Sequence, residues 1–180
     1  SEKTAEVYYL TGEVRFHQSK YADSIILFKR AVSISPDARW LPLAMYRIAR
    51  SFFEISDYTN SVKTFKECIE KYNDEFIKSA SLMGLVYNYE KLGSVQEAIK
   101  SSDEIMSNFA DSAAAPEAYY RKAEMLYDRS EYREAEEICK IGIDRFPKSK
   151  YLGGLHYVLG RIRMAGGRYD EAIEEFRSAD

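Results

Sequence analysis

The chain has 180 residues, enough for one ordinary domain or one array of repeats. Hydrophobic residues make up 46% and charged residues 31% of the sequence, a composition that excludes a disordered chain. The net charge of -3 gives no overall field to attract nucleic acid, and no stretch approaches the ~20 apolar residues of a membrane-spanning helix. We therefore expect no nucleic-acid partner and no direct insertion into a membrane.

Residues that could hold a metal or perform catalysis are sparse. Cys68, Cys139, His17 and His156 lie far apart in the sequence, with the spacing of neither a zinc site nor a disulfide framework. The sequence has no nucleophile elbow, no glycine-rich phosphate loop and no HExxH motif. We expect a protein that is not an enzyme, has no cofactor or metal, and keeps both thiols free and packed.

The sequence repeats with a period of 37 residues and no insertions or deletions. One column of the alignment is mostly aromatic: Tyr21, Tyr58, Val95, Tyr132 and Tyr169. A second combines phenylalanine with smaller residues: Phe28, Phe65, Ser102, Cys139 and Phe176. Three further columns, which begin at Gly12, Ser24 and Ala31, hold small residues except at Val86 and Ile105, both in the third repeat. Small residues at these positions would let two helices approach closely.

Each repeat has the pattern of two helices joined by a short turn. In the fifth repeat Tyr169, Ala172, Ile173 and Phe176 follow the spacing of one helix face. We expect Tyr169, Ile173 and Phe176 to be buried against the preceding helix. Turn signals such as Leu92-Gly93-Ser94 separate the helices of a pair. The sequence therefore predicts an all-α fold of ten helices in five antiparallel pairs, without strands.

The positions of the prolines and of one aspartate refine these helix boundaries. Pro42 and Pro116 share a repeat position and should lie in the first turn of their helices, where the missing amide is not needed. Pro36 and Pro147 should follow the ends of second helices. Asp57 should open the second helix of its repeat.

These residues resemble the tetratricopeptide repeat (TPR) family. The resemblance rests on the following residues of the first and fifth repeats: Tyr8, Gly12, Tyr21, Phe28, Ala31, Pro36, Leu159, Gly160, Gly167, Tyr169, Ala172, Phe176 and Ala179. It implies a single array over residues 1–180, a right-handed TPR-like superhelical solenoid with repeats at about 5–38, 42–75, 79–112, 116–149 and a truncated 153–180. In the family, first helices line a concave groove that binds a protein or peptide segment.

The longer period resembles a bacterial envelope-associated subset of the family. That subset includes outer-membrane assembly lipoproteins of the BamD type and periplasmic proteins associated with the Tol-Pal system. The resemblance implies a periplasmic or outer-membrane-associated location, with the cytoplasm as the alternative, and it names no partner.

Three columns of the first helices are the expected groove residues, because they recur at helical spacing on one face. The first column contains Tyr9, Tyr46, Met83, Tyr120 and Tyr157. The second contains Glu13, Arg50, Tyr87, Glu124 and Arg161. The third contains Phe16, Phe53, Glu90, Tyr127 and Met164. Tyrosine combines a rigid apolar face with a polar tip, as binding surfaces require, although part of the first column could instead be core between repeats.

Two functions follow from this pattern. The first is a scaffold that holds a segment of another protein in a tyrosine-rich groove. The alternative is a self-assembly module whose repeat ends stack, with a possible homo-oligomer through the C-terminal repeat. Because the fifth repeat stops at Asp180, we expect Met164 and Ala172 to lie at an uncovered edge. We therefore expect that the chain continues or that this face meets another molecule.

Overall fold

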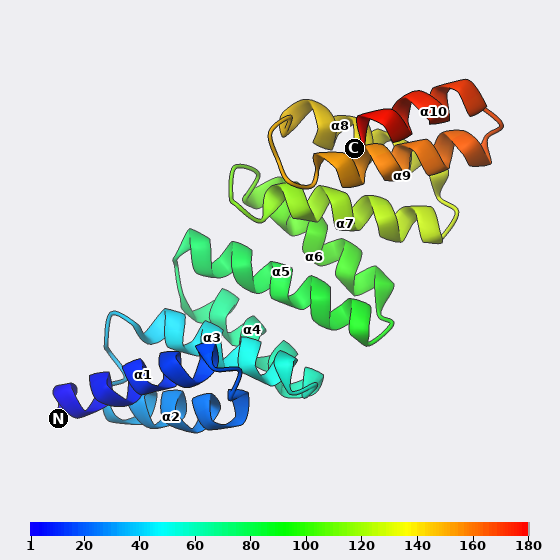
Figure 1. The fold of residues 1–180 in the computed structure, drawn as a ribbon. Coiled ribbons are helices and arrows are strands. Elements are labelled where there is room, and N and C mark those ends of the chain that lie inside the picture. The colour runs from blue at the N-terminus through cyan, green and yellow to red at the C-terminus, as the bar shows by residue number, and fades with distance from the viewer. Residues whose placement is uncertain (180) are drawn as a thin grey trace. The chain divides into compact units, whose positions relative to one another are not determined.

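The computed structural model describes residues 1–179, which form ten helices and no strand (Figure 1). Contacts between residues divide the chain into two compact units, Ser1–Ser94 and Val95–Asp180. The first unit contains α1 (Glu2–His17), α2 (Tyr21–Ile34), α3 (Leu41–Glu54), α4 (Tyr58–Lys71) and α5 (Glu75–Lys91). The second contains α6 (Val95–Asn108), α7 (Ala115–Asp128), α8 (Tyr132–Arg145), α9 (Leu152–Ala165) and α10 (Tyr169–Ser178). The all-α prediction is confirmed for the described residues.

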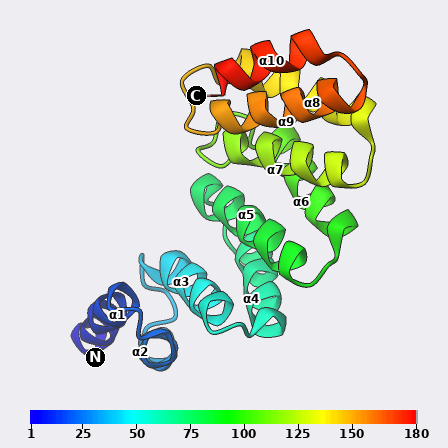
Figure 2. The ribbon, with the colours of Figure 1, turned by 45° about the vertical axis from the view of Figure 1, so that its right-hand side comes forward.

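Helices that follow one another in the sequence pack together within each unit. In the first unit α1 packs on α2, α2 on α3, α3 on α4 and α4 on α5. In the second unit the same order holds from α6 to α10, and Figure 2 shows α9 and α10 side by side. First helices of successive repeats also touch, α1 with α3, α3 with α5 and α7 with α9.

The boundary between the units falls inside the predicted third repeat, 79–112, so its two helices belong to different units. Helix α5 also begins earlier than that repeat was expected to begin. The Asp74 carboxylate accepts a hydrogen bond from the Ile77 amide at 2.9 Å and caps the helix. This capping residue adds a turn to the start of the helix.

The turn inside every helix pair contains one residue with a left-handed backbone. These residues are Ser19, Ser56, Gly93, Ser130 and Gly167, with φ between 59° and 72°. They lie 37 residues apart, so the same turn is built five times. A serine in this conformation is strained, whereas glycine adopts it at no steric cost. Asp57 caps α4, and Pro42 and Pro116 lie in the first turn of α3 and α7, as predicted.

The glycine and phenylalanine columns meet inside the helix pairs. A Cβ atom added to Gly12 would lie 2.8 Å from the Phe28 ring, and one added to Gly160 would lie 2.6 Å from the Phe176 ring. Both distances are shorter than van der Waals contact. Glycine therefore lets the phenylalanine ring lie directly on the backbone of the first helix.

Buried hydroxyl groups connect the early repeats. Ser24 and Ser51 share a hydrogen bond of 2.8 Å, and Asn88 donates one of 3.0 Å to Ser61 at the equivalent repeat positions.

A buried lysine connects helices of the later repeats. Lys122, 7% exposed, lies 2.8 Å from an Asp103 oxygen and 2.9 Å from a Glu134 oxygen. Burial lowers the Lys122 pKa, but the hydrogen bonds to these carboxylates outweigh burial, and the net pKa is raised.

The last helix pair differs in part from expectation. Ala172, expected at an uncovered edge, is buried, because it lies in the small-residue column. Tyr169 and Ile173, expected to be buried against α9, are 66% and 48% exposed. Met164 is exposed as expected. Helix α10 therefore buries Ala172 and part of Phe176, while other apolar side chains of this pair face solvent.

Candidate functional site

The tyrosines of the first column pack at their rings but keep part of their surface open. Tyr9 stacks on Trp40 with ring centroids 4.8 Å apart, and 31 residues separate the two. Tyr120 stacks on Tyr151 at 5.8 Å with the same separation. Tyr9 and Tyr120 therefore each pack against an aromatic residue that directly precedes the first helix of the next repeat.

The other members of the first column are more varied. Tyr46 packs on Phe65 at 5.8 Å and is half-buried, and Tyr157 packs on Phe176 at 5.8 Å but is 52% exposed. Met83, predicted as a groove residue, is only 6% exposed and cannot contact a ligand as the tyrosines can. The first column is therefore neither a wholly open ladder nor wholly core.

The second and third columns contact each other between successive repeats. The Arg50 guanidinium lies 5.6 Å from the centre of the Phe16 ring, and the Arg161 guanidinium lies 4.0 Å from that of Tyr127. The Phe53 and Tyr87 rings are 6.3 Å apart. In all three pairs the partners are 34 residues apart, three fewer than the repeat period of 37. A residue of one first helix therefore lies beside the residue three positions before its equivalent in the first helix of the next repeat.

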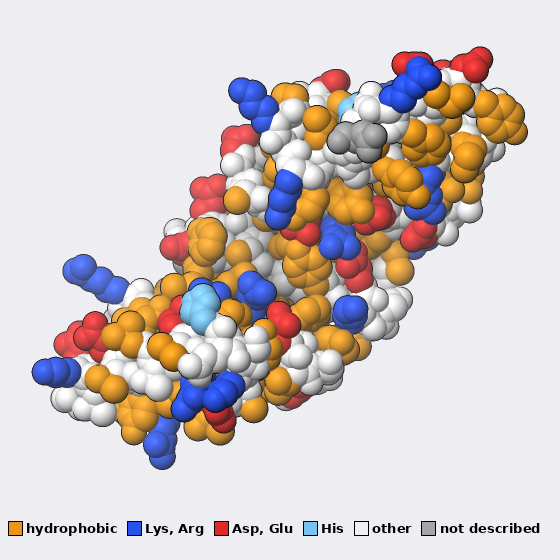
Figure 3. Space-filling model, in the orientation of Figure 1, with side chains coloured by type: hydrophobic (Ala, Val, Ile, Leu, Met, Phe, Trp, Pro, Cys, Tyr) orange, Lys and Arg blue, Asp and Glu red, His pale blue; other side chains and the backbone are white. Residues whose placement is uncertain are grey.

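We call the surface carrying these columns the first-helix face, and describe it separately in each unit. In the first unit its residues are Tyr9, Glu13, Phe16, Tyr46, Arg50, Phe53, Tyr87 and Glu90, and in the second they are Tyr120, Glu124, Tyr127, Tyr157, Arg161 and Met164. Figure 3 shows hydrophobic side chains interleaved with acidic and basic ones over α7 and α9.

Two arginines that the three columns omit also belong to this face. Arg47 donates a hydrogen bond of 3.0 Å to Glu13, and its guanidinium lies 4.7 Å from the centre of the Phe16 ring. Arg121 lies 3.6 Å from Glu117 and 4.0 Å from Glu124. The two arginines share a repeat position.

Two tyrosine hydroxyls of the second unit, those of Tyr120 and Tyr151, have raised pKa values. Burial, followed by a hydrogen bond to Glu124, raises the pKa of Tyr120 to about 12. Burial and a hydrogen bond to Glu117 also raise the pKa of Tyr151. A neutral hydroxyl donates to these carboxylates, so each ring is fixed in orientation. The face presents aromatic rings of fixed orientation with ion pairs beside them, an arrangement better suited to binding a ligand than to catalysis.

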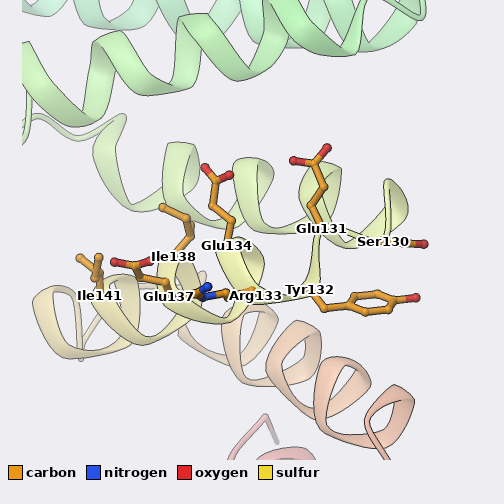
Figure 4. A pocket seen from close by; sticks show the side chains of 8 residues that line it. All are labelled: Ser130, Glu131, Tyr132, Arg133, Glu134, Glu137, Ile138 and Ile141. Carbon is orange, nitrogen blue, oxygen red and sulfur yellow. The ribbon is translucent and has the colours of Figure 1, made fainter.

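A hollow lies beside α8 in the second unit (Figure 4). It has a volume of about 780 Å³ and is lined by Ser130, Glu131, Tyr132, Arg133, Glu134, Glu137, Ile138 and Ile141. Two of its carboxylates already have partners, since Glu134 pairs with Lys122 and Glu131 with Arg129. The hollow therefore offers less free charge than its composition suggests.

Residues 1–179 contain no group of three or more His, Cys, Asp or Glu side chains that could hold a metal ion. Over the same residues, no helix has both the length and the apolar character required to cross a membrane. Cys68 and Cys139 are free and buried, as expected.

Family comparisons agree with the helix pattern. Models described as "Tetratricopeptide repeat" match residues 2–39, 43–74 and 154–180, which together are more than half of the chain. No curated protein matches the sequence.

Solved structures of similar fold cover nearly the whole chain. A crystal structure of MamA protein has a TM-score of 0.77 at 16% identity, over 99% of this chain and 91% of that one. MamA 41-end from Desulfovibrio magneticus RS-1 has a TM-score of 0.77 at 14% identity, over 98% and 93% of the chains. A putative kinesin light chain from Podosopora anserina with nearly identical TPR-like repeats has a TM-score of 0.74 at 14% identity, over 99% of this chain and 94% of that one. At these identities the similarity establishes the TPR-like solenoid fold alone.

Proposed function

Because the chain is a tetratricopeptide repeat protein, we propose that it is a non-enzymatic scaffold whose first-helix face binds a peptide or protein segment of a partner. TPR folds generally serve protein–protein interaction, which gives the class of function. The observation that carries the proposal is the fixed aromatic surface of the second unit. There Tyr120, Tyr127 and Tyr157 are oriented by neighbouring rings, carboxylates and Arg161 while retaining solvent exposure.

The physical advantage of such a face is low entropic cost. A tyrosine already held by stacking or by a hydrogen bond loses little side-chain freedom when a ligand covers it. Tyr157, the most exposed member of the column, offers its ring with the Arg161 guanidinium 5.8 Å from the ring centre. An extended or helical segment with apolar side chains and a few charged groups would fit this surface.

The test is affinity capture from the source cell, followed by titration of the recovered partner segment against variants. Replacing Tyr46 and Tyr120 by Ala, or Tyr157 alone, should weaken binding by about 2 kcal/mol or more if these are hot spots. Phe76→Ala is the matched control, because Phe76 is an exposed aromatic outside the three columns. Phe65→Ala should instead cost about 3–5 kcal/mol of stability, because Phe65 is 1% exposed. Variants that unfold while affinity per folded molecule is unchanged would show that the column is core.

The second candidate function is self-assembly through the repeat ends. It is favoured by the exposed apolar side chains of the last helix pair, among them Met164, Tyr169 and Ile173. The measurement that distinguishes it from scaffolding is molecular mass against concentration. A scaffold stays monomeric on dilution and concentration, whereas an assembly module grows in mass.

The location proposed is the bacterial envelope, in the periplasm or associated with the outer membrane, with the cytoplasm as the alternative. The basis is the resemblance of the 37-residue period to the envelope-associated subset of the family. Cell fractionation with antibodies against the protein tests it, and recovery with cytoplasmic markers would contradict it.

A further inference from the structure

The guanidinium of Arg161 is held by stacking and not by hydrogen bonds. It lies 4.0 Å from the centre of the Tyr127 ring and 5.8 Å from that of Tyr157. The carboxylate of Asp128 is 3.9 Å away, which is beyond hydrogen-bond distance. Within residues 1–179 the guanidinium forms no hydrogen bond. Stacking uses the flat face of the group, so the N–H donors at its edge stay available to a ligand.

The other arginines of the first-helix face already have carboxylate partners. Arg50 occupies the same repeat position as Arg161 and donates a hydrogen bond of 3.4 Å to Glu54. Arg47 donates one of 3.0 Å to a glutamate of the preceding repeat. Arg121 lies between two carboxylates of its own helix, at 3.6 and 4.0 Å. Arg161 therefore differs from its neighbours in keeping its donors while its ring contacts fix its orientation.

The solvent exposure of Arg161 is a property of its repeat position. Its side chain is 31% exposed, and the groups that surround it come from α7 and from its own helix, α9. Arg50 holds the same position in α3, and there the first helix of the following repeat, α5, lies alongside in the same unit. The Arg50 side chain is nevertheless 42% exposed. A following repeat therefore leaves this position open to a ligand.

A carboxylate is the group that fits these donors. The planar guanidinium presents parallel N–H bonds that match the two oxygens of a carboxylate. Two acidic side chains lie nearby, Asp128 and, one helical turn before Tyr127 on α7, Glu124. Their negative charge favours a ligand group with a single charge over a doubly charged phosphate. The half-buried Tyr127 ring adds apolar surface for a side chain next to the carboxylate.

We propose that Arg161 anchors an aspartate or glutamate side chain within the partner segment, and that an adjacent apolar side chain of the segment packs on the Tyr127 ring. This inference rests on the proposed binding function of the first-helix face and names the chemistry that the face selects. The stacked guanidinium has little freedom left to lose, which lowers the entropic cost of binding. Asp128 is 72% exposed, so it turns to solvent when the ligand carboxylate takes the donors.

The probe is a library of short random peptides displayed on phage and selected on the 180-residue chain. Each peptide is joined to the coat protein through its C-terminus, so a carboxylate that contributes to binding belongs to a side chain. Peptides that bind the wild-type chain but not the Tyr120→Ala chain use the first-helix face. These should be enriched in Asp or Glu next to an aromatic or aliphatic residue. The best of them is synthesised with an amidated C-terminus and titrated by calorimetry.

A double-mutant cycle then tests the contact itself. Arg161→Met should weaken binding about tenfold or more, and so should replacing the acidic residue of the peptide by its amide. In the Arg161→Met chain the acidic and amide peptides should bind alike. Arg161→Lys keeps the charge without the planar fork and should recover only part of the affinity. Asp128→Asn should tighten binding, because it removes a competing carboxylate. Arg177→Met is the matched control, since it removes an equal charge outside the face and should leave affinity unchanged.

The outcomes separate this inference from the proposed function. Selected peptides that depend on Tyr120 but lack an acidic residue, or that bind the Arg161→Met chain as tightly as the wild-type chain, overturn the anchor and leave peptide binding standing. Weaker binding to the Asp128→Asn chain also overturns the anchor, because it indicates a cationic ligand. A selection that yields no peptide dependent on Tyr120 overturns both proposals. Circular dichroism checks that each variant is folded, and Arg161→Lys carries the cycle if Arg161→Met unfolds.

Discussion

The guanidinium of Arg161 lies 4.0 Å from the centre of the Tyr127 ring, and the two residues are 34 positions apart on α9 and α7. The same offset joins Arg50 to Phe16. A sequence period of 37 thus produces contacts at 34, because each first helix is displaced by about one turn along its predecessor. The second and third columns therefore form one continuous surface within a unit.

The Arg161–Tyr127 contact should be measurable in stability. We expect a double-mutant cycle with Tyr127→Leu and Arg161→Met to give a coupling free energy of about 0.5–1 kcal/mol, since the cation lies over the ring face. Urea denaturation of the four proteins measures it. The exposed Arg177–Glu174 pair is the control and should give a smaller value. A coupling of zero for Arg161 and Tyr127 would contradict the geometry.

Gly160→Ala should destabilise the last helix pair. The added methyl group would lie 2.6 Å from the Phe176 ring, so the ring must move, at a cost of about 1–3 kcal/mol. Gly166→Ala is the control, because the nearest atom would be 3.5 Å away and its φ is -86°. Thermal unfolding measures both. The loss should shrink in a Phe176→Leu background, and equal losses in the two backgrounds would exclude the clash as the cause.

Ser130→Gly should stabilise the protein. Ser130 has a φ of 61°, and removing its Cβ relieves a strain of about 1 kcal/mol, partly offset by the greater freedom of glycine in the unfolded chain. The expected gain is a few tenths to about 1 kcal/mol, measured as a shift of the urea midpoint. Ser130→Ala keeps the Cβ and should give no gain. Equal effects of the two substitutions would show that the backbone conformation is not responsible.

The buried thiols should make stability fall at alkaline pH. Burial raises the pKa of Cys68 and of Cys139 to about 12, whereas an unfolded cysteine has a pKa of about 8.5. Above that pH the folded chain holds thiol protons that the unfolded chain has lost, so the free energy of unfolding decreases from about pH 9 to about 12. Urea midpoints across this range should fall less steeply for the Cys68→Ala, Cys139→Ala double variant.

The same thiols should resist modification. At pH 8 both are protonated and buried, so alkylation should require unfolding, and mass spectrometry of the native chain should find no Cys68–Cys139 disulfide. Rapid labelling of the folded chain at pH 8 would contradict their burial.

Local chemistry determined the helices, so the sequence predicted them well. Apolar spacing, Pro42 and Pro116 in first turns and Asp57 at a helix start act over a few residues, and the structure places them as expected. The repeat period identified Gly12 and Gly160 as positions where two helices approach closely, because the columns of small residues and of phenylalanines can be aligned from the sequence alone. The fold class followed from these features alone.

The tertiary structure determined two features that the repeat period does not predict, namely the offset between neighbouring first helices and the burial of individual side chains. The offset of 34 that joins Tyr127 to Arg161 depends on how far one helix slides along another, and no single column carries it. Burial likewise depends on what covers a position. Met83 and Tyr157 share a column, yet one is 6% and the other 52% exposed. Equal repeat positions have equal local chemistry, but their surroundings differ, and those surroundings determine which side chains can meet a partner.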